Sequence, residues 1–324
     1  MKQYDVVALG ECLIDFLCTR SENSLIMEGN AGGAPANVLA MLAKLGHRTA
    51  LISKVGQDSF GSFLCDQVSR AGVHAGAILR DQIRPTTLAI VQLDETGNRS
   101  FSFYRDRTAD VMLRQDELPL DLLRNTQIFH FGSLSLTAEP ARTATFEAIR
   151  IARESGATIS YDPNLRPLLW DDQAVARAML TEGLSKADLV KMSEEELTFI
   201  TGETDLSAAA LGLCRMYPIK LMAVTLGPRG CLYCVGGHLY SSPAFAVDTI
   251  DTTGAGDASW GAALSWLLAS RCAPGNLPAG AIADLMTFAN AAGSLATTRK
   301  GAISALPERQ AIEHCIRTTA CLPN

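Results

Sequence analysis

The sequence DTTGAGD at residues 251–257 is followed at once by the apolar run ASWGAALSWLL at residues 258–268. This pattern predicts a tight glycine turn that leads directly into a helix. The first N–H groups of a helix have no partner within it. Together with the positive end of the helix dipole, they favour a phosphate or a developing negative charge. Asp257 lies beside this predicted anion site, where a second negative charge is useful only if it takes part in the chemistry.

Most of the remaining chain alternates between short apolar strands and helical segments. Such alternation predicts a doubly wound α/β fold with a mostly parallel central sheet. We expect strands at residues 4–9, 49–55, 127–131, 157–162, 187–192 and 220–226, and helices at 38–45, 59–71, 138–155, 171–183, 194–201 and 206–217. A ribbon at 231–240 and a long helix at about 280–298 follow.

Two strand-like runs at residues 86–93 and 99–104 interrupt this alternation, and residues 94–98 between them predict a hairpin turn. An antiparallel ribbon inside an α/β series indicates a separate layer, which could act as a lid. Phe103 and Arg105 at the end of the ribbon could close over a polar ligand. They could equally pack along an edge strand, which is the commoner role of such residues.

Composition excludes several classes of protein. Of the 324 residues, 48% are hydrophobic and 19% are charged, which predicts a substantial core. A net charge of −6 without a basic cluster argues against nucleic-acid binding. Charges at Asp5, Glu11 and Asp15 interrupt the first apolar segment, so neither a signal peptide nor a membrane span fits, and we expect a cytoplasmic protein. The nine cysteines are odd in number and irregularly spaced, which favours a structural or incidental role.

Polar residues follow several predicted strands, at the edge of the sheet where α/β proteins bind ligands. Asp15 could bind hydroxyl groups or lie in a surface turn, and Arg166 could bind a phosphate or form a surface ion pair. The glycines of AGGAPAN at 31–37 allow backbone to approach a ligand, although a plain loop before a helix would look similar. A Walker motif, a G-x-G-x-x-G after the first strand and a G-x-S-x-G elbow are all absent from the sequence.

The order of these motifs resembles that of the ribokinase-like sugar kinases, the PfkB family, from the first strand to Pro307. DTTGAGD is the most specific of the shared motifs. The others are GECLIDF (10–16), AGGAPANV (31–38), KVGQDSFG (54–61), SYDPNLR (160–166), KMSEEE (191–196), VTLGPRG (224–230) and FANAAGSLATTRKGA (288–302). Within the family, the segments GECLIDF, FSFYRDRTAD (101–110), HFGSLSLTAEP (130–140) and YDPNLRPLLW (161–170) look most like those of fructokinases.

The resemblance implies a ribokinase-like three-layer α/β sandwich, with a mostly parallel central sheet and a small β-sheet lid. It implies one domain over residues 1–324, with lid segments at about 15–33 and 86–110 inserted in it. Because lids of this family often pair across a two-fold axis, we expect a homodimer formed through the lid.

The resemblance also implies roles for individual residues. Asp257 would be the catalytic base, and the amides from Gly254 through Ala255 and Gly256 to Asp257 would form an anion hole. Arg166 would bind phosphates. The sugar would contact Asp15, Gly32, Gly33 and Asn37, with Phe103 and Arg105 closing over it. The nucleotide pocket would include Lys191, Thr225, Gly227, Gly230, Asn290 and the glycines of the anion hole.

The implied cofactors are ATP and Mg²⁺, with K⁺ at a further site. Many family members have an N-x-x-E motif that organises the waters of Mg²⁺, but this chain has Lys191 in place of the asparagine. Glu194 would retain that role, and Lys191 could contact a phosphate directly. The monovalent cation would be bound by oxygens around Asp251, Thr253, Ala296, Arg299 and Gly301.

The expected function is the ATP-dependent phosphorylation of D-fructose to fructose 6-phosphate, with no nucleic-acid or membrane partner. Same-fold alternatives are kinases for aminoimidazole riboside or another nucleoside, for ribose, or for 2-keto-3-deoxygluconate. A non-catalytic sugar sensor is a more distant alternative.

Overall fold

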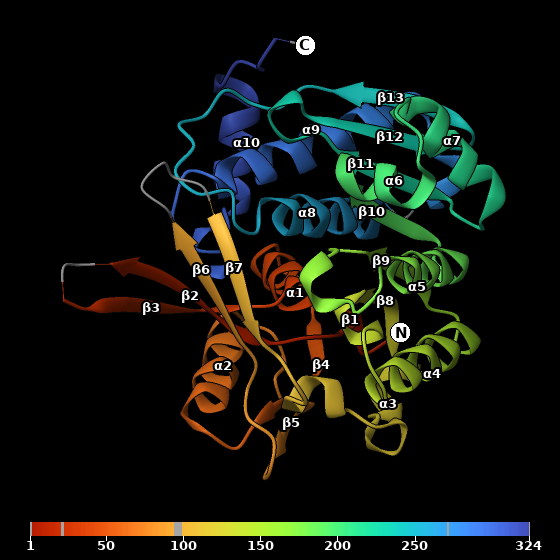
Figure 1. The fold of residues 1–324 in the computed structure, drawn as a ribbon. Coiled ribbons are helices and arrows are strands. Elements are labelled where there is room, and N and C mark those ends of the chain that lie inside the picture. Colours follow the sequence, from red (N-terminus) through yellow and green to blue (C-terminus); the bar gives the residue numbers. More distant parts are fainter. Residues whose placement is uncertain (1, 21–22, 94–98, 271, 324) are drawn as a thin grey trace.

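A nine-stranded sheet runs through the centre of the molecule (Figure 1). The computed structural model describes residues 2–20, 23–93, 99–270 and 272–323. The strand order is β13-β12-β11-β10-β9-β8-β1-β4-β5. The strands are β1 (Tyr4–Leu9), β4 (Thr49–Gly56), β5 (Ile78–Asp81), β8 (Thr126–Gly132), β9 (Thr158–Asp162), β10 (Leu189–Ser193), β11 (Leu221–Thr225), β12 (Cys231–Val235) and β13 (His238–Ser242).

The sheet is parallel from β5 to β11, and only β12 and β13 pair antiparallel. Its strands are buried on both faces. In β1, Val6 and Ala8 pack into one hydrophobic cluster, while Val7 and Leu9 pack into the other. Because successive side chains of a strand point to opposite faces, this alternation predicts helices on both sides of the sheet.

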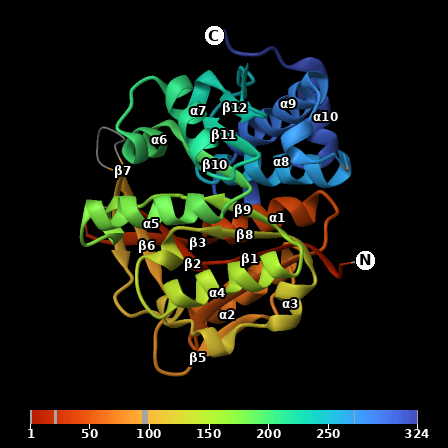
Figure 2. The ribbon, with the colours of Figure 1, turned by 90° about the vertical axis from the view of Figure 1, so that its right-hand side faces the viewer.

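Helices cover the two faces in two groups. One group packs on the face of Val6: α1 (Ala34–Lys44), α2 (Ser59–Arg70), α8 (Ala255–Ser270), α9 (Ala279–Ala296) and α10 (Arg309–Thr318). The other packs on the face of Val7: α3 (Leu120–Arg124), α4 (Ala141–Glu154), α5 (Gln173–Lys186), α6 (Glu194–Thr201) and α7 (Leu206–Met216). Figure 2 shows α3, α4 and α5 of the second group toward the viewer. The α/β sandwich predicted from the sequence is confirmed. Among the described residues, no helix is both long and apolar enough to span a bilayer.

A second sheet of four strands projects from one side of the body, at the left of Figure 1. Its order is β3-β2-β6-β7, with β2 and β6 parallel and the outer pairs antiparallel. The strands are β2 (Leu13–Arg20), β3 (Leu25–Gly32), β6 (Leu88–Leu93) and β7 (Arg99–Tyr104). The small sheet predicted from the two segments is confirmed, and the expected turn at 94–98 lies outside the described residues. Asp15 belongs to β2, so it is not in a surface turn.

Three helices begin at residues other than those expected. α5 begins at Gln173 instead of 171, because Asp172 is its N-cap and accepts from the amide of Ala174. α1 begins at Ala34, four residues before the predicted start at 38, because Gly33 is its N-cap and Pro35 fits the first turn, where no N–H is needed. α4 begins at Ala141 instead of 138, because Pro140 occupies the N-cap position and a 3₁₀ turn at Leu134–Leu136 precedes it.

α1 and α8 pack against each other at a glycine. A Cβ on Gly261 of α8 would lie 2.7 Å from Cβ of Met41 and 3.0 Å from the backbone oxygen of Val38, both in α1. The hydrogen of glycine therefore lets the two helix backbones approach more closely than any side chain would allow. On the same helix, the indole N–H of Trp260 donates to Oγ of Ser160 in β9 (3.0 Å), which ties α8 to the sheet.

We predict that Gly261→Ala destabilises the protein by about 1–3 kcal/mol, because the added methyl group forces α1 and α8 apart. Chemical denaturation of both proteins would measure the change in the free energy of unfolding. Gly212→Ala is a matched control: Gly212 lies inside α7, and a Cβ there meets nothing within 4 Å. That control should be stabilised by up to about 1 kcal/mol. Equal effects of both substitutions would contradict close packing at Gly261.

Candidate active site

Several strands and helices that carry candidate residues end or begin near one edge of the main sheet. β9 ends at Asp162, β10 at Ser193 and β11 at Thr225, and these strands are parallel neighbours. The carboxyl ends of parallel strands therefore meet at the same edge, where open α/β sheets bind ligands. The N-termini of α1 and α8 are joined to this edge by the contacts described below.

Asp257 lies in the first turn of α8, and its side chain is buried. Its Oδ2 accepts a 2.8 Å hydrogen bond from Nδ2 of Asn37, in the first turn of α1. A hydrogen bond to a charged group contributes about 1.5–3 kcal/mol. The asparagine predicted to contact the sugar therefore also holds the predicted base.

The pKa of Asp257 is raised above the ordinary value of 3.8, and burial is the largest cause. The charge of Asp162 also raises this pKa. The charges of Lys191 and Arg166 and the hydrogen bond from Asn37 oppose the shift. A carboxylate with a raised pKa is a stronger base, which suits it to accept a proton from a hydroxyl group.

The glycines of the DTTGAGD turn make space around Asp257. Gly254 has a φ of +74°, and a Cβ there would lie 2.9 Å from Cβ of Ala302. A Cβ on Gly256 would lie 2.9 Å from Nζ of Lys191. Of the predicted anion-hole amides, that of Ala255 donates to the backbone oxygen of Thr252 at 3.3 Å. Helix geometry leaves the next amides, of Gly256 and Asp257, without a carbonyl partner inside α8.

Asp15 and Phe103 lie on the same face of the small sheet. Asp15 pairs with Ala89 of β6, and Ala89 pairs with Phe103 of β7. Residues directly opposite each other on neighbouring strands project to the same face. Asn30 of β3 pairs with Asp15 and completes the row, although the sequence alone did not identify it.

Glycines also frame Asp15 and the start of α1. A Cβ on Gly32 would lie 2.0 Å from Oδ2 of Asp15, so only glycine leaves room for that carboxylate. Gly33, with a φ of +112°, would place a Cβ 2.3 Å from the backbone oxygen of Glu11. Burial raises the pKa of Asp15 to about 6, although Arg166 lowers it. The charge of Asp257 also raises the pKa of Asp15, so the two carboxylates influence each other's ionisation.

Arg105 is buried, and protein atoms engage its guanidinium. Nε donates to Oδ2 of Asp110, Nη1 to Oγ1 of Thr137 and Nη2 to the backbone oxygen of Leu134, all at 2.8 Å. Asp110 neutralises the charge, since the two side chains are only 4% and 3% exposed. Arg105 therefore joins the end of β7 to the segment after β8.

Lys191 and the acidic residues after it take different positions. Nζ of Lys191 donates to Oδ2 of Asp162 at 2.8 Å. Glu194 forms an ion pair with Arg229, and its side chain is partly exposed. Glu196 is buried and its pKa is raised, chiefly by burial. Its Oε1 accepts from the amide of Leu165 (2.6 Å) and its Oε2 from that of Ser193 (2.7 Å).

Sequence reasoning missed the roles of Glu196 and Glu11. Ser193 and Glu196 form a capping box at the start of α6, and the spacing S-x-x-E was the signal for it. Oε1 of Glu11 accepts from the amide of Ala34 at 3.0 Å and thereby caps α1 from a distance. Its Oε2 is buried without a hydrogen-bond partner among the described residues, and burial raises the pKa of Glu11 to about 7.

Four of the candidates for the nucleotide pocket lie on β11, in the loop after it and on α9. Nδ2 of Asn290 donates to the backbone oxygens of Ser242 (3.1 Å) and Pro243 (2.9 Å), so it holds the end of β13 against α9. A Cβ on Gly230 would lie 2.0 Å from the backbone oxygen of Ser242. Gly227, by contrast, has a φ of +57° and open space around it. Oγ1 of Thr225 donates weakly to the backbone of β10, at 3.4 Å.

Three of the five residues predicted around a monovalent cation meet. Oδ1 of Asp251 accepts from the amide (3.0 Å) and the hydroxyl (2.7 Å) of Thr253, and its Oδ2 accepts from the amide of Gly301 (3.0 Å). Ala296 is buried at the end of α9, and Arg299 is exposed. The oxygen donors of Asp251 and Thr253 are of the type that hard cations prefer.

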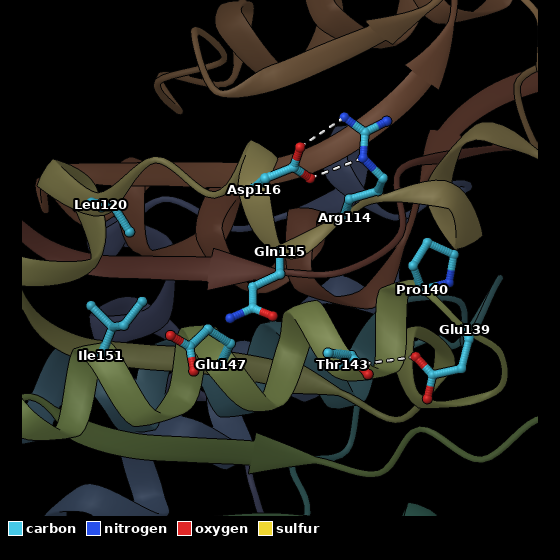
Figure 3. A pocket seen from close by; sticks show the side chains of 9 residues that line it. All are labelled: Arg114, Gln115, Asp116, Leu120, Glu139, Pro140, Thr143, Glu147 and Ile151. Atoms are coloured by element: carbon cyan, nitrogen blue, oxygen red, sulfur yellow. Dashed lines mark hydrogen bonds and ion pairs between the residues drawn. The ribbon is translucent and has the colours of Figure 1, made fainter.

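A surface pocket of about 620 Å³ lies elsewhere, between α4 and the 3₁₀ turn η2 (Gln115–Glu117). Figure 3 shows Arg114 paired with Asp116 at its rim, and Glu139 bonded to the amide of Thr143. Both of these carboxylates are therefore already engaged by protein atoms, and none of the predicted site residues lines the pocket.

Comparison with known proteins gives concordant results. Residues 3–309 match the pfkB family of carbohydrate kinases. A probable fructokinase-4 from Arabidopsis thaliana is 41% identical over 317 residues, which cover 96% of each chain. The fructokinase of Xylella fastidiosa, solved with bound ATP, superimposes with a TM-score of 0.89 at 34% identity, over 97% of this chain and 98% of that one. A double mutant of the fructokinase of Vibrio cholerae O395, solved with fructose, ADP and potassium ion, gives 0.86 at 33% identity, over 98% and 99% of the two chains.

We predict that Asn37→Ala moves the acid limb of the pH profile of turnover to higher pH. Asn37 stabilises the charged form of Asp257, so its loss raises the pKa of Asp257 further. As the predicted base, Asp257 loses its charged form as the pH falls through that pKa. Steady-state rates measured across the acid range would show the shift. Asn125→Ala, which removes an exposed side-chain bond to the backbone at the end of α3, should leave the profile unchanged. An unmoved acid limb in Asn37→Ala would contradict the assignment.

Proposed function

Because this chain belongs to the pfkB family of carbohydrate kinases, we propose that it transfers the γ-phosphoryl group of ATP to the terminal hydroxyl of D-fructose. Family membership makes the chain a sugar kinase, a phosphotransferase with an alcohol group as acceptor. The product of the proposed reaction is fructose 6-phosphate. The single observation that carries the proposal is the buried Asp257, held by Asn37 at the N-terminus of α8 beside Gly256 and Lys191.

Asp257 accepts the proton of the attacking hydroxyl, and its raised pKa suits that task. The amides at the start of α8 and the ammonium of Lys191 then stabilise the negative charge on the transferring phosphoryl group. Arg166 supports the same charge from the loop after β9. Asp15, Gly32, Gly33 and Asn37 bind the sugar, and Phe103 covers it from the same face of the small sheet as Asp15.

The residues present fit a Mg²⁺ ion that arrives with ATP. Among the described residues, no group of three or more His, Cys, Asp or Glu side chains is arranged to hold a metal ion. The protein would therefore hold Mg²⁺ through the nucleotide and through water, as this ion often requires. The partly exposed Glu194 is the carboxylate that we assign to those waters. When bound, Mg²⁺ neutralises charge on the phosphates.

For K⁺ we propose the oxygens around Asp251, Thr253 and Gly301, with further oxygens from the backbone of Ala296 and Arg299. The nucleotide pocket is assigned to the loop of Thr225, Gly227 and Gly230 together with Asn290. A cytoplasmic location stays a prediction, which fractionation of the native cells would test.

The ion pair of Arg105 with Asp110 helps to distinguish neutral sugars from sugar acids as acceptors. A sugar acid such as 2-keto-3-deoxygluconate needs a cation for its carboxylate, and Arg105 was the candidate near the small sheet. Asp110 already neutralises this guanidinium, so a neutral sugar is the better match. The identity of the acceptor among neutral sugars rests on the likeness to fructokinases.

We also infer a homodimer formed through the small sheet. β3 is an edge strand of that sheet, and its residues Leu25, Ile26 and Met27 are 56%, 60% and 43% exposed. An apolar edge strand left in water is a site for pairing with another chain. A second copy related by a two-fold axis would cover this edge.

We predict that Asp257→Asn lowers kcat by about 10²–10⁴-fold, the contribution of one general base, while the affinity for ADP stays nearly unchanged. A coupled ADP-release assay measures turnover, with D-fructose, ribose, aminoimidazole riboside and 2-keto-3-deoxygluconate as acceptors. D-Fructose should give the highest kcat/KM. Asp284→Asn on the exposed face of α9 is the control and should keep full activity. Substantial activity of Asp257→Asn would contradict the assignment of Asp257 as the base. A higher kcat/KM with another acceptor would contradict fructose as the substrate. Sugar binding by the wild type without any turnover would indicate a sugar sensor.

We predict that Ile26→Lys converts the dimer to a monomer, because a charge at the edge of β3 opposes strand pairing. Light scattering coupled to gel filtration gives the molar mass directly. Ile83→Lys introduces the same charge at a residue that is 85% exposed in the loop after β5, and it should leave the dimer intact. A wild-type protein that is monomeric at all concentrations would contradict the proposed interface.

A further inference from the structure

Lys191 and Asp162 form a buried ion pair at the ends of two neighbouring strands. Their side chains are 9% and 1% exposed, and Nζ lies 2.8 Å from Oδ2. The last registered pair of β9 and β10 is Tyr161 with Val190, and both of these residues pack on the face covered by α3–α7. By strand alternation, Asp162 and Lys191 point to the opposite face, which α1 and α8 cover.

The ammonium group reaches the first turn of α8. A Cβ on Gly256 would lie 2.9 Å from Nζ of Lys191 and 3.2 Å from its Cε. An ammonium has three N–H donors, and Asp162 accepts one of them. The remaining donors lie near the first amides of α8, which have no carbonyl partner in the helix. The charge of the ammonium and the positive end of the helix dipole therefore act at the same place.

Lys191 keeps its charge in this position. Burial alone would lower its pKa, but the carboxylates of Asp162, Glu196 and Asp257 outweigh that effect and raise it. Of these carboxylates, Asp162 forms the ion pair with the ammonium, and the charge of Asp257 acts on it as well.

The carboxylate of Asp162 is itself held in place. Its Oδ1 accepts a 3.1 Å hydrogen bond from the amide of Asn164, a residue with a φ of +43°. The backbone oxygen of Pro163 accepts a 3.1 Å bond from the amide of Ser133 at the end of β8. The turn after β9 thus orients Asp162, and Asp162 fixes the position of the ammonium.

We propose that Asp162 is a positioning residue that holds the ammonium of Lys191 beside Gly256, so that Lys191 donates to the transferring phosphoryl group. The inference rests on the proposed function, because it assigns the pair a task in phosphoryl transfer. Lys191 acts on the charge that develops during transfer, so the loss of its position lowers kcat more than it changes KM.

The test compares Asp162→Asn, Lys191→Met and the double variant in steady-state kinetics with D-fructose and ATP. Asp162→Asn should lower kcat about 10-fold or more, the size of one charge-assisted hydrogen bond, with both KM values within about threefold of wild type. In the Lys191→Met background, the same substitution should change kcat by less than about threefold. An equal loss in both backgrounds, or a loss confined to KM, would overturn the inference.

A binding measurement keeps the test independent of turnover and of the folding of Lys191→Met. Calorimetry with ADP alone and with ADP plus aluminium fluoride, an anion that mimics the transferring phosphoryl group, compares wild type with Asp162→Asn. The fluoride complex should weaken about 10-fold or more, while ADP alone stays within about threefold. Equal weakening of both ligands would overturn the inference. If wild type fails to phosphorylate fructose, the proposed function fails, and the fluoride result still tests the pair.

The control is a second lysine with a partly buried carboxylate partner. Nζ of Lys54 lies 2.8 Å from Oε1 of Glu117, and their side chains are 7% and 19% exposed. Glu117 belongs to η2, which packs on α4. Glu117→Gln should lower the melting temperature and leave kcat unchanged. A loss of kcat in this variant equal to that of Asp162→Asn would show that any weakened lysine pair impairs turnover, and would overturn the specific role of Asp162.

Discussion

The hydrogen bond from Asn37 to Asp257 joins two helix N-termini that are 220 residues apart in the sequence. Its 2.8 Å length requires α1 and α8 to begin at the same place and to pack closely. Glu11 secures the first requirement by capping Ala34, and Gly261 secures the second by leaving room for Met41. A substitution that alters the packing at either position would therefore displace Asp257 through this hydrogen bond, because close-packed protein interiors transmit small displacements. The carboxylate of Asp257 is thus placed by the contact between two helices as much as by its own turn.

Charge balance around this bond explains why so many ionised groups share a small buried space. Asp15, Asp257 and Asp162 bring negative charge, and Lys191 and Arg166 bring positive charge. Burial raises the pKa values of Asp15 and Asp257, and the cations limit the rise, so the carboxylates remain useful as acceptors of hydrogen bonds and protons. Gly32 and Gly256 leave room for the carboxylate of Asp15 and the ammonium of Lys191.

Much of this arrangement could be predicted from the sequence, because local patterns determine it. The buried-strand pattern of β1, the glycine turn before α8 and the ribbon of β6 and β7 each carry their own signal over a few residues. The misses have a common physical reason. The sequence did not indicate that Arg105 pairs with Asp110, or that Glu196 accepts from the distant amide of Leu165. Partners brought together by tertiary folding leave no periodic trace along the chain.

The proposed recognition and shielding of the acceptor depend on the same small sheet. Asp15 and Phe103 occupy one registered row of that sheet, so a shift of the sheet moves the two side chains together. Arg105 ties the end of β7 to Leu134 and Thr137 after β8, which anchors the sheet to the body near the site. The small sheet is thus anchored through the strand at one edge, β7, and exposes apolar side chains of the strand at the other edge, β3. A second chain paired along β3, as proposed, would leave the anchor at Arg105 in place.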